Sequence, residues 1–352
     1  METVGLSTII PFVGLFVLFI FLGFYGKYWR RGNLNDTHEW SLAGRKLGTT
    51  LVFFLIGADI YTAYAFVALP SGVFAKGSFY FLTYAAVAFG VALVTMPRLL
   101  ALSKEKGYIT ASDFIKDRFG GTTLSVLIAI TGIVSLLPYI ALQIVGMQSV
   151  LIVMLSGTTN SQLVEEIALL VAFVVLAAFT YTSGLRGATL TAVLKDILIW
   201  ITVIAVIVVV PLSISGGFGT AFRDVKPNYL TVPSPLVTGY ATLVLGSALA
   251  LYLYPHAING VLSSESVHKL RRSTALLPLY GIGLAIMALM GILVYAVPPA
   301  MNFLSHFPES SRGILVVPSL ILYSILFGSI SFCDINHFTA YSKSLSSFPP
   351  QS

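Results

Sequence analysis

Long apolar segments separated by short polar connections dominate the chain. A helix of about 20 apolar residues crosses the hydrocarbon core of a membrane, so each of these segments up to residue 297 predicts a transmembrane helix. Segment 123–155 is longer than a straight span needs, and Pro138 within it predicts a kink. The segments are 6–26, 47–70, 78–101, 123–155, 163–182, 189–213, 236–256 and 274–297, and 313–333 is a further candidate span.

The basic residues of the connections alternate between two sides of the predicted membrane. Cytoplasmic loops carry an excess of lysine and arginine, so the uneven distribution predicts a multi-pass protein of the cell membrane with its N-terminus outside. The first apolar run has no basic leader and is followed by KYWRR, so we expect a retained helix rather than a cleaved signal peptide. The expected cytoplasmic side receives Lys27, Arg30, Arg31, Arg45, Lys46, Arg98, Lys104, Lys106, Lys116, Arg118, Arg186, Lys195, Lys269, Arg271 and Arg272, and the other side Lys76, Arg223, Lys226 and Arg312.

Composition agrees with a membrane protein. The 352 residues are 57% hydrophobic and 10% charged, and their mean hydropathy is +0.90, whereas soluble domains carry about 25% charged residues. The net charge of +6 is explained by the basic loops and does not indicate nucleic acid as a partner. The single cysteine, Cys333, excludes an intramolecular disulfide and a cysteine-based metal site. No P-loop, carboxylate pair or nucleophile–base set occurs, so an enzyme is not predicted and the expected partners are a small solute and the lipid bilayer.

An acidic residue lies in the middle of the second apolar segment. Asp59 lies in LVFFLIGADIYTAYAFVALPSGVFAKG, residues 51–77, two positions after Gly57. An ionisable group at membrane depth is costly, so it indicates function, although hydrogen bonding to a neighbouring helix is the simpler alternative. Glycine weakens the helix there, and a carboxylate beside freed carbonyl groups suits a small hard cation. From these residues alone, sodium and the proton both remain open.

A second weak point occurs at Gly246 and Ser247 in segment 236–256. Paired interruptions, here and at Gly57, are typical of transporters built from inverted repeats, whose binding sites lie between the broken helices. Taken singly, each glycine is better explained by close helix packing, and as a pair the two explanations carry equal weight. His256, which closes this segment, is either a hydrogen-bonded interfacial histidine or a solute contact.

Several stretches together resemble the sodium/solute symporters, a family with a LeuT-type core. They are EWSLAGRKLG (39–48), GADIYTAYAFVALPSG (57–72), TASDFIKDRFG (110–120), LPYIALQIVG (137–146) and YTSGLRGA (181–188). The resemblance implies an all-α polytopic membrane protein, with an inverted-repeat helical core preceded by one extra N-terminal helix. ALYLYPHAINGVLSSES (250–266) and SGLRGATLTAVLKD (183–196) look most like the monocarboxylate permease branch.

The resemblance implies a sodium-coupled symporter that moves a small organic solute by alternating access, with no cofactor beyond Na⁺ as coupling ion. A monocarboxylate such as lactate or pyruvate is the expected solute, and an amino acid such as proline is the alternative. A hypothesis from another class is a membrane sensor or remnant that does not transport.

The resemblance also implies site residues. Backbone carbonyl groups of Gly57 and Ile60 are expected to coordinate sodium, with Ala58 and Asp59 between them. Many family members carry an aspartate at the position of Ala192, and Asp196, one turn further on, is the expected substitute. The expected solute-binding residues are Tyr61, Thr62, Pro138, Tyr139, Gln143, Ser247, Tyr252 and Tyr254.

The end of the sequence departs from the family pattern. The family's next core helix is rich in small and hydroxyl residues, and nothing in 327–352 resembles it. We therefore expect one transmembrane domain over 1–326 with an incomplete second repeat, followed by an atypical tail. This pattern suggests a transporter cut short at its C-terminus.

Overall fold

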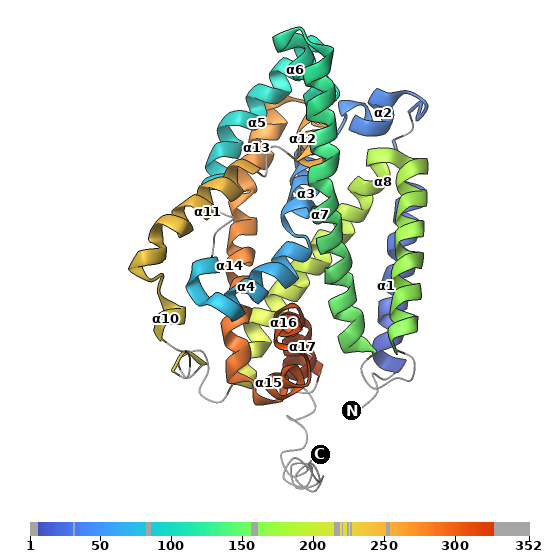
Figure 1. Cartoon of the computed structure of the whole chain (residues 1–352). Coiled ribbons are helices and arrows are strands. Elements are labelled where there is room, and N and C mark those ends of the chain that lie inside the picture. The colour runs from blue at the N-terminus through green and yellow to red at the C-terminus, as the bar shows by residue number, and fades with distance from the viewer. Residues whose placement is uncertain are drawn as a thin grey trace, which may run out of the picture.

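The computed structural model describes residues 6–30, 32–81, 86–155, 161–214, 219, 221–223, 225, 227–250 and 254–326. Within these ranges the chain is all-α, and the only β feature is an isolated parallel bridge between Leu47 and Ser264. The helices form an elongated bundle (Figure 1). The predicted all-α fold class is therefore confirmed.

The helices follow one another along the chain with short connections. In the first half they are α1 (Leu6–Tyr25), α2 (Thr37–Leu42), α3 (Thr49–Ile60), the π-helix η2 (Tyr64–Ala68), α4 (Leu69–Lys76), α5 (Ala86–Lys106), α6 (Ala111–Phe119) and α7 (Thr122–Met154). The second half contains α8 (Ser161–Ser213), α10 (Pro227–Leu230), α11 (Val237–Ala250), α12 (Pro255–Leu262), α13 (Val267–Leu276), α14 (Pro278–Leu293), α15 (Pro298–Ser305), α16 (Glu309–Arg312), α17 (Val316–Ile321) and the π-helix η7 (Leu322–Leu326).

Three helices among the described residues are long and apolar enough to cross a membrane: α7, α8 and the run from α13 to Ala296. Two bent pairs raise that number to five if each is one span: α3 with the helix after it, and α11 with α12. The predicted segments 163–182 and 189–213 both lie in α8, on either side of Gly184, where the helical geometry is interrupted. The number of crossings beyond these stays a prediction.

Gly184 divides α8 because its backbone has φ 57° and ψ −150°, which L-residues with a side chain rarely adopt. The kink accommodates α2, because Trp40 of that helix donates its indole N–H to the carbonyl of Tyr181 at 3.0 Å. A Cβ atom at Gly184 would overlap the carbonyl oxygen of Trp40. The glycine is therefore required both by conformation and by space.

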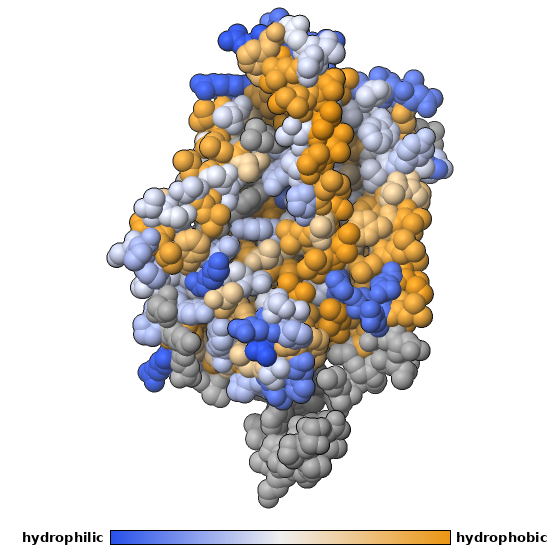
Figure 2. All heavy atoms as spheres, in the orientation of Figure 1, coloured by the Kyte–Doolittle hydropathy of each residue, from blue (hydrophilic) through white to orange (hydrophobic). Residues whose placement is uncertain are grey.

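The distribution of apolar side chains fits a bilayer environment. Figure 2 shows a column of hydrophobic atoms along α7, and Leu127, Ile130, Ile133 and Leu137 of that helix are exposed. By contrast, α14 is buried along most of its length, with Tyr280, Leu284 and Met287 almost inaccessible. Since lipid replaces water around a membrane protein, the exposed apolar face of α7 is consistent with contact to acyl chains.

The polar connections gather at the two ends of the bundle. At one end lie α2 and α6, and at the other lie α10, α15 and α16 (Figure 1). At the first end, Lys104 donates to the carbonyl of Glu265 and Arg45 donates to Ser103 at 2.9 Å. These bonds join connections that the basic-residue pattern assigned to one side.

The described part of candidate span 313–333 consists of short pieces: η6 (Gly313–Leu315), α17 and η7. Serine and leucine side chains of α17, Ser319 and Leu320, are buried, so this stretch packs inside the protein. The remaining residues of the candidate span, and the whole tail 327–352, lie outside the described residues.

Candidate cation and solute site

The helix that carries Asp59 breaks later than expected. α3 continues through Gly57 to Ile60, and Tyr61 ends it by donating its N–H to the carbonyl of Gly57 at 2.8 Å. The axis then bends by 47° before the helix resumes at Tyr64. The expected interruption at Gly57 is therefore wrong, since the break lies at 61–63.

Gly57 serves helix packing instead. A Cβ atom there would overlap the hydroxyl and ring of Tyr280 from α14. The reverse arrangement occurs nearby, because a Cβ atom at Gly283 would overlap the Tyr61 hydroxyl, which donates to the Tyr280 carbonyl at 3.1 Å. Two glycines thus admit two tyrosines between α3 and α14, so that the helices approach closely.

Tyr61 was expected to contact solute, and the structure assigns it a different place. Its side chain is 1% exposed, and its ring packs edge-on against Tyr280 and Trp200, with centroids 4.8 and 6.0 Å away. The hydroxyl group is used within the protein. Tyr61 therefore anchors the break in the helix rather than lining the solute side.

Asp196 lies against this aromatic group. The Tyr280 hydroxyl donates to Asp196 Oδ2 at 2.6 Å, and the aspartate side chain is fully buried. Its second oxygen, Oδ1, has no hydrogen-bond partner among the described residues. A buried carboxylate oxygen without a donor is costly, so this oxygen is available to a cation or a proton.

Lys195 extends from α8 to the helix of Asp59. Its Nζ donates to the carbonyl of Ala58 at 2.6 Å, and its charge interacts with Asp59 and Asp196. The sequence pattern placed Lys195 among the basic residues of the expected cytoplasmic side, whereas the structure places its ammonium group inside the bundle against α3. The helix begins just after Gly184 rather than at residue 189, so Lys195 lies about one turn deeper than expected.

A second group of the predicted solute-binding residues lies together beside the bend. Gln143 of α7 accepts the Ala63 N–H at 3.1 Å, which satisfies one of the backbone groups freed by the break. One turn earlier, the Tyr139 ring lies 5.6 Å from that of Tyr254, and Thr62 interacts with the Tyr139 hydroxyl. Thr62, Tyr139, Gln143 and Tyr254 are thereby brought together.

His256 belongs to this group, although the pattern left its role open. Its ring centroid lies 4.7 Å from that of Tyr139 and 5.3 Å from that of Tyr254, at interplanar angles of 31° and 28°. It occupies the first turn of α12, whose cap is Tyr254 and whose first residue is Pro255. The helix start is favoured by proline, which needs no N–H partner there.

The structure also describes two of the other expected residues. Pro138 is exposed on α7, about 100° around the helix axis from Tyr139. Ser247 is half-buried within α11, which continues past Gly246 to Ala250. The expected interruption at Gly246 is therefore also wrong: the 51° bend between α11 and α12 falls after Ala250. Tyr252 lies outside the described residues.

The candidate cation ligands are all oxygens. The carbonyl groups of Gly57 and Ile60 and the carboxylate of Asp59 lie at the end of α3, and Asp196 approaches from α8. Oxygen donors suit hard cations. No cluster of three or more histidine, cysteine, aspartate or glutamate residues suited to a transition metal occurs in the described part of the chain.

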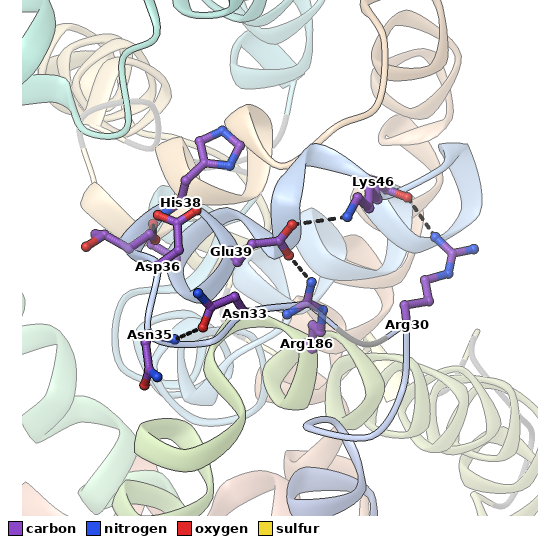
Figure 3. Close-up of polar contacts among 10 residues, drawn as sticks. Arg30, Asn33, Asn35, Asp36, His38, Glu39, Lys46 and Arg186 are labelled. Carbon is purple, nitrogen blue, oxygen red and sulfur yellow. Dashed lines mark hydrogen bonds and ion pairs between the residues drawn. The ribbon is translucent and has the colours of Figure 1, made fainter.

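A polar network secures the connection that leads into α3. Glu39 of α2 forms ion pairs with Arg186 of α8 and, at 3.0 Å, with Lys46, while Arg30 donates to the Lys46 carbonyl at 2.6 Å (Figure 3). Arg186 is 1% exposed. Burial opposes the ionised form of Glu39, but hydrogen bonds from Lys46 and Arg186 outweigh it and hold the pKa of Glu39 below its ordinary value.

Taken together, a bent helix with an intramembrane carboxylate, packed among long apolar helices, defines the class of polytopic secondary transporters. The family model of the sodium:solute symporters matches residues 40–312. The chain belongs to the sodium:solute symporter family, whose members are transporters and not enzymes.

Three relatives of this chain carry names that describe transporters or symporters. A monocarboxylate transport permease protein of Rhizobium johnstonii is 36% identical over 337 residues, which are 92% of this chain and 65% of that protein. The uncharacterized symporter YodF of Bacillus subtilis is 35% identical over 76% of this chain and 55% of its own length. A sodium/proline symporter of Staphylococcus aureus is 25% identical over 94% of this chain and 64% of its own length. The chain thus spans less than two thirds of the length of these relatives.

A solved structure shares the fold. The substrate-bound outward-open state of a Na⁺-coupled sialic acid symporter superposes with a TM-score of 0.67 at 13% identity, covering 99% of this chain and 76% of that one. The LeuT-type fold expected from the sequence is confirmed.

Proposed function

We propose that this chain is the transport core of a symporter that moves a small organic solute together with sodium by alternating access. The observation that carries the proposal is the bend at 61–63. There a helix end bearing Asp59 meets solute-facing polar groups of α7 and α12, including Gln143 and Tyr139. Membership of the family supports sodium as the coupling ion.

In this proposal the cation binds at the end of α3. Carbonyl oxygens of Gly57 and Ile60 and the carboxylate of Asp59 would hold it, with Ala58 between them and Asp196 as the acidic group of α8. The Gly57 carbonyl still accepts the Tyr61 N–H, whereas the Tyr64 N–H donates to Thr62 Oγ1 instead of the Ile60 carbonyl. Since the bend leaves the Ile60 carbonyl without its helical donor, a cation there stabilises the bent form. Cation binding and the arrangement of the solute group are coupled because Thr62 and Ala63 directly follow the cation ligands.

The proposed solute is a monocarboxylate. The hydroxyl groups of Tyr139 and Tyr254, the His256 ring and the N-terminal turn of α12 offer donors to a carboxylate group without a buried arginine. The flat aromatic faces suit a small apolar body such as that of lactate or pyruvate. The name of the Rhizobium johnstonii relative supports this class.

A sodium-coupled amino acid symporter is the second candidate. The sodium/proline symporter of Staphylococcus aureus, which is 25% identical to this chain, favours it. A proline-like substrate carries the same carboxylate and adds an ammonium group. The two candidates therefore differ in whether the site also accepts a positive charge.

The proposed orientation has the N-terminus outside the cell. The end of the bundle that carries α2, α6 and the α12–α13 connection would then face the cytoplasm, where the positive-inside rule places most lysine and arginine residues. Cysteine substitutions at Lys106 and at Arg312, labelled by an impermeant reagent in intact cells, test this: only the Arg312 position is expected to react. Exclusive reaction at position 106 would reverse the orientation.

Tracer uptake tests the function. The full chain in proteoliposomes is supplied with radiolabelled lactate, pyruvate or proline, under an inward sodium gradient or an equal potassium gradient. We expect lactate or pyruvate to accumulate only with sodium, and D59N to lose the sodium dependence while E105Q, on the exposed end of α5, keeps it. Equal uptake under the sodium and the potassium gradient would contradict sodium coupling, and so would uptake driven by a pH gradient alone. Absence of uptake together with absence of solute binding would contradict symport altogether.

A further inference from the structure

The side chain of Lys195 brings a positive charge beside the proposed cation site. It reaches from α8 to the end of α3 and donates to the carbonyl of Ala58 at 2.6 Å. Ala58 is one of the residues between the proposed sodium ligands Gly57 and Ile60. A lysine at membrane depth is costly unless its charge is compensated, which points to a role tied to the charges around it.

Two carboxylates compensate Lys195. Asp59 of α3 and Asp196 of α8 both interact electrostatically with the Lys195 ammonium group, and so does His256 of α12. The ammonium group makes no ion pair within 4.0 Å with either aspartate among the described residues. Its hydrogen bond goes to the neutral Ala58 carbonyl at 2.6 Å, so the ammonium group does not directly occupy either carboxylate.

The unpartnered oxygen of Asp196 is independent evidence that this site binds a further positive charge. The Tyr280 hydroxyl satisfies Asp196 Oδ2 at 2.6 Å, whereas the fully buried Oδ1 has no partner in the described part of the chain. With both aspartates ionised, Lys195 supplies one of two positive charges that the site requires. One negative charge remains, and a single monovalent cation balances it.

We propose that Lys195 is a built-in cation of the site, so that it limits the chain to one external sodium ion. The ammonium group of Lys195, which is tethered to α8, takes one of the two positions that Asp59 and Asp196 would otherwise offer to free cations. The inference rests on the proposed sodium-coupled function and adds a residue that sets the number of coupling ions. It differs from a purely structural role, in which Lys195 only ties α8 to α3.

The experiment measures equilibrium binding of ²²Na⁺ to the purified full chain in lipid nanodiscs. We expect one Na⁺ per chain for the parent protein and for K195R, which keeps the charge. K195M keeps the length but not the charge, and is expected to bind two Na⁺, or one with at least tenfold higher affinity. K195Q keeps a hydrogen-bond donor for Ala58 without the charge, so it is expected to behave like K195M. The control K76M, on an exposed lysine at the end of α4, is expected to match the parent.

The double variant K195M/D59N links the effect to the carboxylate, since removing one negative charge should return binding to one Na⁺ at the parent affinity. If K195M and K195Q bind sodium within twofold of the parent protein, the inference is overturned. If the same samples still bind radiolabelled lactate, the proposed function stands. Two Na⁺ bound by the parent would also overturn the inference. Absence of Na⁺ and lactate binding in every folded variant would instead reject the proposed function and the inference together.

Discussion

The hydroxyl group of Tyr280 occupies the space where a side chain at Gly57 would begin. The aromatic ring lies directly against the glycine backbone, and the same hydroxyl donates to Asp196 at 2.6 Å. One contact thus joins α3, α14 and α8 beside Asp59. The packing of the helix and the placement of the acidic group on α8 depend on the absence of a Cβ atom at this position.

G57A is expected to disrupt this contact. The methyl group must displace Tyr280, which overpacks the core at a cost of about 1–3 kcal/mol and weakens the bond to Asp196. A lower thermal unfolding temperature and weaker sodium binding are expected together. G90A on α5, where a Cβ atom meets nothing within 4 Å, is the control and should leave both unchanged. Equal behaviour of the two variants would show that Tyr280 moves aside freely.

Y280F removes the donor to Asp196 but keeps the ring. The buried carboxylate then loses its hydrogen bond from Tyr280, which is expected to cost about 1.5–3 kcal/mol because the acceptor is charged. Y61F removes a bond to a neutral carbonyl and should cost about 1 kcal/mol. Chemical denaturation of the two variants in the same detergent compares them. A larger loss in Y61F would mean that Asp196 is neutral in the folded protein.

G184A is expected to be more harmful than an ordinary glycine substitution. Alanine at φ 57° costs about 1–2 kcal/mol from the backbone alone. The added Cβ atom would also overlap the Trp40 carbonyl, which lies on the connection into the core. G107A is the matched control, since Gly107 has φ 76° but open space around it. Thermal unfolding should show a loss in both variants and a larger loss in G184A; equal losses would remove the role of the Trp40 contact.

Much of the fold could be predicted because it depends on local pattern. Apolar length determined the long helices α7 and α8, and an isolated Asp59 in such a helix indicated the site. The roles of Gly57 and Gly246 could not be predicted, since a glycine that breaks a helix and one that admits a neighbouring ring look alike in sequence. At Gly57 the position of Tyr280, far along the chain, identifies the packing role, whereas a Cβ atom at Gly246 would meet nothing within 4 Å.

The position of Lys195 inside the bundle could not be predicted from the local pattern either. Close to the end of an apolar segment, a lysine normally marks the cytoplasmic flank, because its long side chain can reach the membrane surface. The left-handed backbone of Gly184 starts the second part of α8 earlier, which moves Lys195 into the bundle. Its direct neighbour Asp196 was the available signal, since two opposite charges in succession inside an apolar segment are unusual.

The ion pair between Glu39 and Arg186 makes a prediction about pH. Because the pKa of Glu39 is lowered in the folded protein, its carboxylate stabilises the fold at pH values above the ordinary glutamate pKa. That contribution declines as the pH falls through the ordinary value and is lost below the lowered one. Removing the charge with E39Q leaves Arg186 buried without its partner, which is expected to cost about 3 kcal/mol near neutral pH.

Thermal unfolding from pH 7 to pH 3 measures the effect in the parent protein and in E39Q. The two curves are expected to differ most at pH 7 and to converge as Glu39 becomes protonated in acid. E309Q is the control, because Glu309 is exposed on α16 at the other end of the bundle, and its curve should follow that of the parent protein. A constant difference between E39Q and the parent across the whole range would mean that the amide disturbs packing, since loss of the charged contact alone must disappear at low pH.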